Sequence, residues 1–241
     1  MDEEVLKGKT LLVVDDETDL RDIVASELEF MGAKVFQAEN IIIAQKILQE
    51  EYIDLVVSDI RMPGGTGIDL LDYIKARDVN FPPIILITGF ADITVEKAFD
   101  KGAEALMNKP FKLDDLIKTV VKYTSPPVER FKSSVENVPE KIHQDVHTGE
   151  CDIGRGGMSL RFNTDGKKFE VGELLRFDVR YNNQELKGTG ICRWYHSPDQ
   201  LMHKASIGLE FIDLNEPTFN KCQQIWEERK IVPFIPALES P

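Results

Sequence analysis

Five short runs of consecutive apolar residues, separated by helix-length amphipathic segments, constrain the first half of this chain most strongly. A strand that is apolar along its whole length is typical of a parallel sheet with helices on both faces. The expected strands are Thr10–Val14, Val35–Phe36, Leu55–Ser58, Pro83–Ile87 and Ala105–Met107. The expected helices are Thr18–Met31, Ile41–Glu50, Ile68–Arg77, Ile93–Lys101 and Leu113–Tyr123. The pattern therefore predicts an α/β domain with a doubly wound, five-stranded parallel sheet.

The chain changes character near residue 124, where Pro126 and Pro127 interrupt a helical pattern. We place a linker at 124–140, between a first domain at 1–123 and a second at 141–241. Shorter alternating segments then predict strands at Gly157–Phe162, Leu174–Val179, Gly190–Trp194 and Ser206–Phe211, turns at Asn163–Gly166 and Asn182–Asn183, and a helix at Glu216–Lys230. The second domain is predicted to be an antiparallel β-barrel or sandwich with a C-terminal helix.

Composition excludes several classes of function. With 29 basic and 42 acidic residues the net charge is −13, which argues against binding to a nucleic-acid backbone. No apolar run approaches the ~18 residues of a membrane span, and Met1-Asp2-Glu3-Glu4 lacks the basic start of a secretory signal. Cys151, Cys192 and Cys222 fit neither a disulfide framework nor a metal motif. We expect buried thiols, no membrane span and a cytoplasmic location.

Polar side chains follow four of the predicted parallel strands. In such a sheet, chemistry is located beyond the carboxyl ends of the strands. Those ends carry Asp15 and Asp16, then Asp59, Thr88 and Lys109. Crowded carboxylates repel one another unless a cation compensates them, and a set of oxygen ligands suits Mg²⁺. The sequence therefore predicts a magnesium site at this edge of the sheet.

A carboxylate beside a metal ion and a lysine can accept a phosphoryl group as a mixed anhydride. Asp59 would be the nucleophile, and Lys109 together with Mg²⁺ would neutralise charge on the phosphoryl oxygens. Thr88 would donate its hydroxyl to one of those oxygens and draw its loop inward. A single aspartate at a strand end is usually a cap or turn residue, so the prediction depends on all five residues occurring together.

Residues 8–123 resemble the receiver domain of two-component response regulators. The resemblance lies in Val14-Asp15-Asp16, Asp59-Ile60-Arg61-Met62-Pro63-Gly64, Ile87-Thr88-Gly89 and Asn108-Lys109-Pro110-Phe111. It implies a flavodoxin-like fold and phosphorylation of Asp59 by a histidine kinase. It also implies Mg²⁺ on Asp15, Asp16, Asp59 and the Arg61 carbonyl, and allows a homodimer through the receiver. Two positions depart from the family: Thr66 stands where many members have Asp, and Leu106 where many have a switching Tyr or Phe.

Residues from about 130 to 230 resemble a PilZ domain, a small barrel that in many bacteria binds cyclic di-GMP. The resemblance lies in Glu150–Leu160, Val171–Glu173, Gly190–Trp194 and Ile207–Phe211. The family's ligand motifs are RxxxR and [DN]xSxxG. In the second motif Asp152 and Gly157 match but Gly154 replaces the serine, and in the first Arg130 is followed four residues later by Ser134. We therefore expect no binding of cyclic di-GMP.

These features predict a response regulator, not an enzyme, which controls an unidentified downstream protein through its PilZ-like domain. The alternative is a dual-input effector that also binds cyclic di-GMP at a variant site, and a direct binding measurement distinguishes the two. A catalytic or DNA-binding output is disfavoured, because neither a second nucleophile constellation nor a helix-turn-helix pattern is present.

Three further expectations concern surfaces. Segments Asp92–Gly102, Ala105–Asn108 and Leu113–Tyr123 form the predicted switching face of the receiver. The tail Ile231–Leu238 is apolar enough either to bind a partner or to pack on its own barrel. His143 and His147 are expected to be a surface pair, and the basic residues of the second domain, Arg193 among them, are expected to face solvent.

Overall fold

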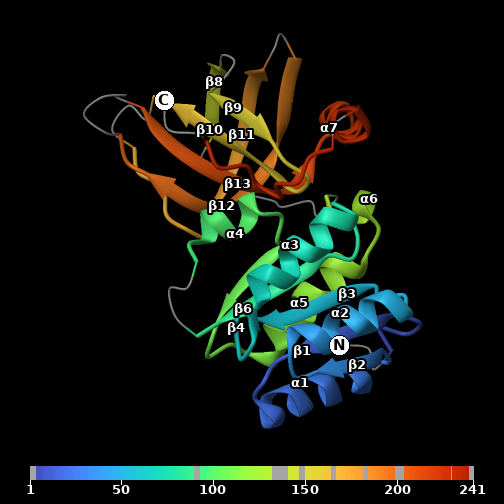
Figure 1. Ribbon diagram of the computed structural model, residues 1–241. Helices are drawn as coiled ribbons and strands as arrows, with labels where there is room; N and C mark the ends of the chain where they lie inside the picture. The colour runs from blue at the N-terminus through green and yellow to red at the C-terminus, as the bar shows by residue number, and fades with distance from the viewer. Residues whose placement is uncertain are drawn as a thin grey trace. The chain divides into compact units, whose positions relative to one another are not determined.

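The computed structural model describes residues 4–89, 93–131, 141–146, 150–163, 167–181, 184–198, 204–228 and 230–238. Several features predicted from the sequence lie outside the described residues. They are most of the linker, residues 164–166 and 182–183 of the two turns, Asp92, His147 and the side chain of His143. The chain forms two compact units, Met1–Thr94 with Lys101–Pro126 and Val95–Asp100 with Pro127–Pro241. Figure 1 shows the helices and strands of both units.

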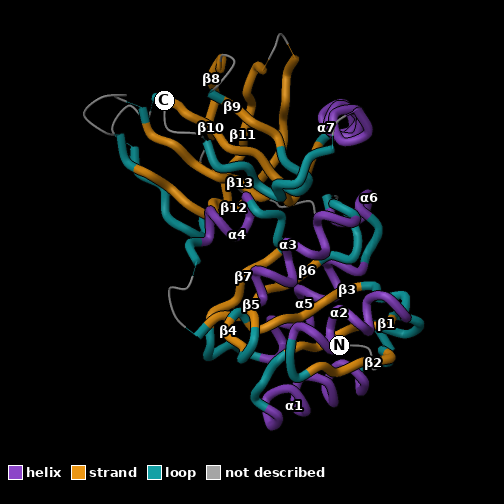
Figure 2. Tube along the Cα trace, viewed as in Figure 1, coloured by secondary structure: helices purple, strands orange, loops and turns teal. Residues whose placement is uncertain are grey.

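The first unit contains a parallel five-stranded sheet in the order β2-β1-β3-β6-β7. Its strands are β1 (Thr10–Val14), β2 (Lys34–Ala38), β3 (Leu55–Asp59), β6 (Ile84–Thr88) and β7 (Ala105–Asn108). Its helices are α1 (Thr18–Phe30), α2 (Ile41–Glu50), α3 (Gly67–Arg77) and α5 (Leu113–Thr124). Every residue of β3 and β6 is buried, because helices lie on both sides of the sheet (Figure 2). The predicted doubly wound sheet is confirmed.

Two short strands of the first unit were not predicted. β4 (Arg61–Met62) and β5 (Gly65–Thr66) form a small antiparallel pair directly after β3. Strands of two residues are too short for an alternating pattern to show in the sequence. The pair fills the connection between Asp59 and the start of α3, and it therefore belongs to the rim that carries the predicted site.

The second unit contains a six-stranded sheet in the order β8-β11-β12-β13-β10-β9. Its strands are β8 (Lys141–Val146), β9 (Cys151–Ile153), β10 (Gly157–Phe162), β11 (Leu174–Tyr181), β12 (Gln184–His196) and β13 (Ala205–Leu214). Its helices are α4 (Val95–Asp100), α6 (Pro127–Arg130) and α7 (Glu216–Glu228). The sheet differs from the predicted antiparallel one where β8 pairs in parallel with β11, because β9 and β10 intervene in the chain and provide the crossover that a parallel pair needs.

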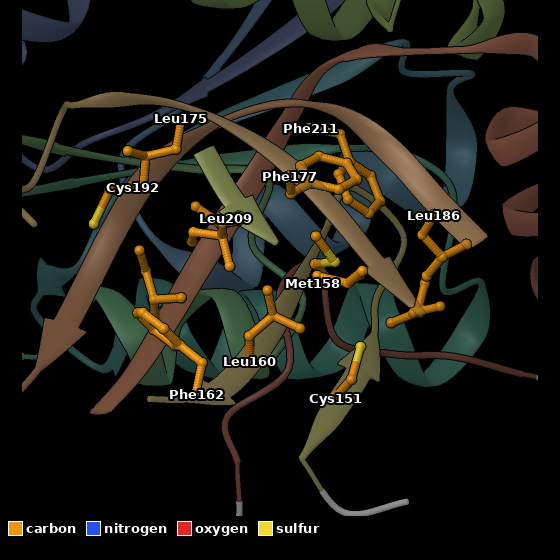
Figure 3. Packing of buried hydrophobic residues seen from close by; sticks show 14 of the residues in the cluster. Cys151, Met158, Leu160, Phe162, Leu175, Phe177, Leu186, Cys192, Leu209 and Phe211 are labelled. Carbon is orange, nitrogen blue, oxygen red and sulfur yellow. The ribbon is translucent and has the colours of Figure 1, made fainter. Parts of the chain in front are cut away.

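One side of this sheet packs into a hydrophobic core. Figure 3 shows Met158, Leu160 and Phe162 of β10 together with Phe177 and Phe211 from two other strands. The ring of Phe131 meets that of Phe211 edge-on at a centroid distance of 6.1 Å. The three cysteines, Cys151, Cys192 and Cys222, are buried in the same core as free thiols. They fill space, as expected.

Helix α4 departs from the prediction in two ways. It covers Val95–Asp100, within the predicted Ile93–Lys101, and it belongs to the second unit, although the predicted first domain was 1–123. Its residues Glu96, Phe99 and Asp100 all have partners in the second unit. Such contacts depend on residues more than 90 positions away, which local sequence patterns do not reveal. None of the described helices has the length and apolarity needed to cross a membrane.

Candidate functional site

Two buried carboxylates lie at the carboxyl ends of adjacent strands. Asp15 follows β1 and Asp59 ends β3, and their exposed fractions are 3% and 5%. The two strands are paired in register at Val14 and Ser58, so the next residue of each reaches the same edge. Asp15 Oδ1 accepts a hydrogen bond from Glu17 N at 2.8 Å, and Asp59 Oδ2 accepts one from Arg61 N at 2.7 Å. These backbone donors orient both carboxylates.

Lys109 joins the two carboxylates. Its Nζ lies 2.8 Å from Asp59 Oδ1 and 3.2 Å from Asp15 Oδ2, and 3.1 Å from Glu17 Oε1. Lys109 follows β7, and its backbone N–H donates to the Thr88 carbonyl at 2.6 Å. Residues at the carboxyl ends of β1, β3 and β7, which are far apart in the sequence, therefore meet around one ammonium group, as the strand order predicts.

The pKa values of the site reflect burial opposed by charge. Burial raises the pKa of Asp15 more than the hydrogen bond from Glu17 and the charge of Lys109 lower it. For Lys109, burial acts to lower the pKa, but the hydrogen bonds to Asp59 and Glu17 and the charges of Asp15 and Asp59 outweigh it and raise the pKa. Lys109 therefore stays protonated at neutral pH and is the local counter-charge of the two aspartates.

The other predicted site residues occupy the same rim. Thr88 ends β6 and is 2% exposed, whereas Asp16 and Arg61 are exposed next to Asp15 and Asp59 in the chain. Sequence analysis missed Glu17, whose exposed carboxylate contacts Lys109. The run Asp15-Asp16-Glu17 was the available signal, but only the first two residues were assigned to the rim.

The residues on the rim fit a magnesium ion. Asp15 and Asp59 present buried carboxylate oxygens at one edge, with Asp16 and the Arg61 carbonyl beside them in the chain. Within the described part of the chain, no three His, Cys, Asp or Glu side chains already form a metal cluster. Mg²⁺ commonly uses only one or two carboxylates and keeps several waters for the remaining positions. The donor set, all oxygen, matches that preference.

Thr66, which departs from the receiver pattern, has a structural role. It is the N-cap of α3: Thr66 Oγ1 accepts a hydrogen bond from Asp69 N at 3.1 Å, and Thr66 N donates to Asp69 Oδ2 at 2.8 Å. The Thr66 hydroxyl also donates to Asp69 Oδ2 at 2.7 Å, and this hydrogen bond, together with the one from Thr66 N, lowers the pKa of Asp69. The next residue, Gly67, is required because a Cβ there would overlap the Asp59 carbonyl. The capping box thus fixes α3 close behind Asp59.

The residues that were expected to form a degenerate cyclic di-GMP motif lie in the second unit. Asp152 is exposed on β9, while Gly154 and Gly157 are buried and Arg130 ends α6. Arg193, which was expected on the solvated face, is partly exposed and also has a buried partner. Its Nη2 lies 2.6 Å from Oε2 of Glu210, which is 1% exposed, because a buried carboxylate needs a counter-charge.

Comparison with known proteins is consistent with this geometry. A model of the response regulator receiver domain matches residues 11–121. The phosphate regulon transcriptional regulatory protein PhoB of Pseudomonas aeruginosa is 34% identical over 192 residues, which are 73% of this chain and 75% of that protein. The chain belongs to the response regulators. The receiver that was expected from the sequence is confirmed, and with it the family.

Other relatives of this response regulator match about half of the chain. The sporulation initiation phosphotransferase F of Bacillus subtilis is 30% identical over 49% of this chain and 95% of that protein. The response regulator PilR of P. aeruginosa is 33% identical over 49% of this chain but only 27% of its own length. The crystal structure of TrrA from Thermotoga maritima, in complex with Mg²⁺-BeF, is 32% identical over 48% of this chain and 98% of that chain, with a TM-score of 0.43.

Proposed function

We propose that Asp59 of this response regulator accepts a phosphoryl group from a histidine kinase. The observation that carries the proposal is the single ammonium group of Lys109, which contacts the buried carboxylates of Asp59 and Asp15 at 2.8 and 3.2 Å. This arrangement places a cation beside the Asp59 carboxylate, where the negative charge of a phosphoryl group would arrive. A carboxylate nucleophile needs such a counter-charge to stabilise the incoming group.

Transfer of the phosphoryl group to Asp59 needs no oxidant or reductant. A carboxylate oxygen of Asp59 forms a bond to phosphorus while the P–N bond of a phosphohistidine breaks, and the imidazole nitrogen keeps the electron pair of that bond. Lys109 then neutralises charge on the phosphoryl oxygens, and Thr88 donates its hydroxyl to one of them. Asp15, Asp16, Asp59 and the Arg61 carbonyl would hold Mg²⁺. When bound, this ion supplies Lewis-acid stabilisation of the same oxygens.

For the output we propose a PilZ-like domain that binds a protein and not cyclic di-GMP, and that has no catalytic activity. The RxxxR pair that would bind the phosphodiesters is incomplete, since the residue four positions after Arg130 is Ser134 and not arginine. Each lost charged hydrogen bond removes about 1.5–3 kcal/mol. Two arginines thus account for roughly 3–6 kcal/mol, on the order of a hundred- to ten-thousand-fold in affinity. The net charge of −13 favours a protein partner over DNA, although PhoB is named as a transcriptional regulator.

Phosphoryl transfer is tested by incubating the full chain with acetyl phosphate and Mg²⁺ and measuring intact mass. We expect one added phosphoryl group in the wild type and none in Asp59→Asn or without Mg²⁺. Asp72→Asn is the matched control, because Asp72 is an exposed carboxylate on α3 that pairs with Lys101. Labelling that persists in Asp59→Asn would refute the assignment.

The ligand question is settled by isothermal titration of the full chain with cyclic di-GMP. We expect no heat of binding at micromolar concentrations. A dissociation constant near or below ~10 μM would replace our proposal with the dual-input reading. In that case, Asp152→Ala should abolish the signal, because Asp152 is the exposed residue that matches the family motif.

A further inference from the structure

The C-terminal tail, residues 231–238, is bound along a glycine-rich loop of the second unit. The loop, residues 154–157, connects β9 to β10. Arg155 N donates to the Pro233 carbonyl at 3.0 Å and Gly156 N to the Phe234 carbonyl at 2.9 Å. Arg155 Nε donates to the Val232 carbonyl at 3.1 Å. Phe234 and Ile235 are buried, with exposed fractions of 3% and 0%. The tail is thus held both by its backbone and by its apolar side chains.

The glycines of this loop match the tail. A Cβ on Gly154 would overlap the backbone of Phe234, and a Cβ on Gly156 would overlap its ring. A Cβ on Gly157 would lie 2.7 Å from Ile235 Cγ1. Gly154, which replaces the serine of the nucleotide motif, therefore has a different use in this chain: it lets the tail approach closely.

The same tail also binds α4. The Phe234 N–H donates to the Phe99 carbonyl at 2.8 Å, and the Ala237 N–H donates to Asp100 Oδ1 at 2.8 Å. The Phe99 and Phe234 rings are 5.8 Å apart. The backbone of Phe234 thus accepts a hydrogen bond from the glycine-rich loop and donates one to α4. Phe234 therefore connects the loop to the helix.

A contact from β12 adds to this attachment. His196 Nε2 lies 3.0 Å from Glu96 Oε2, where Glu96 is in the first turn of α4. Three of the six residues of α4, Glu96, Phe99 and Asp100, are therefore engaged by the tail or by β12. A helix of this length has little stability of its own, so its position depends on these contacts.

Helix α4 lies within the segment that matches the receiver family, residues 11–121, and begins seven positions after Thr88. We propose that the tail is a clamp that holds α4 on the β-sheet unit, and that phosphorylation of Asp59 and closure of the clamp oppose each other. The opposition rests on the proposed function, because Thr88 must move toward the phosphoryl group and pull on the chain that leads into α4. Binding linkage then requires the effect to be reciprocal: opening the clamp favours phosphorylation.

The clamp is tested by hydrogen exchange on the full chain, comparing wild type with Phe234→Ala. We expect amide protection in residues 95–100 and 154–157 to fall at least tenfold and that of β1 and β3 to stay unchanged. Phe30→Ala is the matched control, because Phe30 is 60% exposed on α1. Gly156→Ala, which displaces the Phe234 ring from the loop side, should reproduce the effect if Phe234→Ala impairs folding. Unchanged protection at 95–100 in both variants would overturn the clamp.

The opposition is tested by the rate of acetyl phosphate labelling at Asp59. We expect Phe234→Ala to be labelled at least fivefold faster than wild type, because opening the clamp raises the population of the conformer that reacts, and Phe30→Ala to be labelled at the wild-type rate. Equal rates in wild type and Phe234→Ala would overturn the opposition, while phosphorylation itself would stand. If no protein is labelled, the proposed function fails, and the clamp is then judged by hydrogen exchange alone.

Discussion

At the scale of single residues, the buried carboxylate of Asp15 lowers the stability of the folded protein. Its carboxylate is buried, and burial raises its pKa. The charged form is therefore disfavoured in the folded protein. We predict that Asp15→Asn raises the Tm of the Mg²⁺-free protein at pH 7, by about 2–4 °C if the gain is ~1 kcal/mol.

The sign of this effect with pH follows from the raised pKa. The folded state binds the proton of Asp15 more tightly than the unfolded state, so the penalty exists above the folded pKa and disappears as pH falls through it. The advantage of Asp15→Asn in a thermal melt should shrink at acidic pH. Asp16→Asn, at an exposed position, is the control and should leave the Tm nearly unchanged. A lower Tm in Asp15→Asn would contradict the prediction.

A second prediction at the scale of single residues concerns the reactivity of the buried thiols of Cys192 and Cys222. Burial raises the pKa of Cys192 and Cys222 to about 12 in each case, with the charge of Glu173 adding to the effect at Cys192. A thiol must ionise to react, so at pH 8 we expect a disulfide reagent to label the native chain at least ~100-fold more slowly than the chain in urea. The unfolded thiols ionise first, so stability should fall as pH rises above about 9. Rapid labelling of the native chain would contradict the burial of these residues.

At the scale of elements, the start of α3 depends on one hydroxyl. Thr66 caps the helix through the Asp69 N–H, and the loss of such a cap typically costs about 1 kcal/mol. We predict that Thr66→Ala lowers the Tm by ~2–4 °C, measured by circular dichroism. Thr66→Ser keeps the hydroxyl and should remain close to wild type. Equal losses in both variants would show that the methyl group matters and not the cap.

The sequence revealed strands that are buried along most of their length. β1, β6 and β10 were predicted within one residue at each end, because their side chains are apolar without interruption or alternate clearly. β8 and β9 were missed. β8 has mostly polar residues, and β9 is three residues long. A strand can be predicted from the sequence when its own side chains are apolar in the pattern that a buried strand requires.

The sequence predicted which residues meet at the candidate site, but it did not predict the buried ion pair elsewhere in the same unit. The convergence of Asp15, Asp59 and Lys109 follows from strand order alone, since all lie at strand carboxyl ends. The buried ion pair of Lys75 with Glu104, at 2.9 Å, was not predicted, because it joins α3 to the residue before β7. Charged residues in a sequence are usually exposed, and only the tertiary fold shows which of them are paired inside.

At the scale of the whole molecule, the two units are not two consecutive stretches of sequence. The chain passes between them at Thr94–Val95, Asp100–Lys101 and Pro126–Pro127. Helix α4 thus remains covalently tied at both ends to the first unit, while its residues Glu96, Phe99 and Asp100 have partners in the second. A change in the first unit can reach the second through this segment without any ligand in the second, which suits a protein whose sole predicted input is phosphorylation.

Net charge is also a property of the whole molecule. Because it makes the Tm depend on any salt, binding of Mg²⁺ at the rim has to be measured against the effect of a salt that does not bind there. With a charge of −13, any salt should stabilise the fold by screening repulsion. A cation that binds the folded rim adds RT ln(1 + [L]/Kd), which is about 1.4 kcal/mol at ten times Kd. We predict that MgCl₂ raises the Tm by roughly 3–6 °C more than NaCl of equal ionic strength. In Asp59→Asn this excess should vanish while the NaCl effect persists, because only the rim is altered. If the two salts act equally on the wild type, the rim does not bind Mg²⁺, and the proposed role of Asp15, Asp16 and Asp59 as its ligands is wrong.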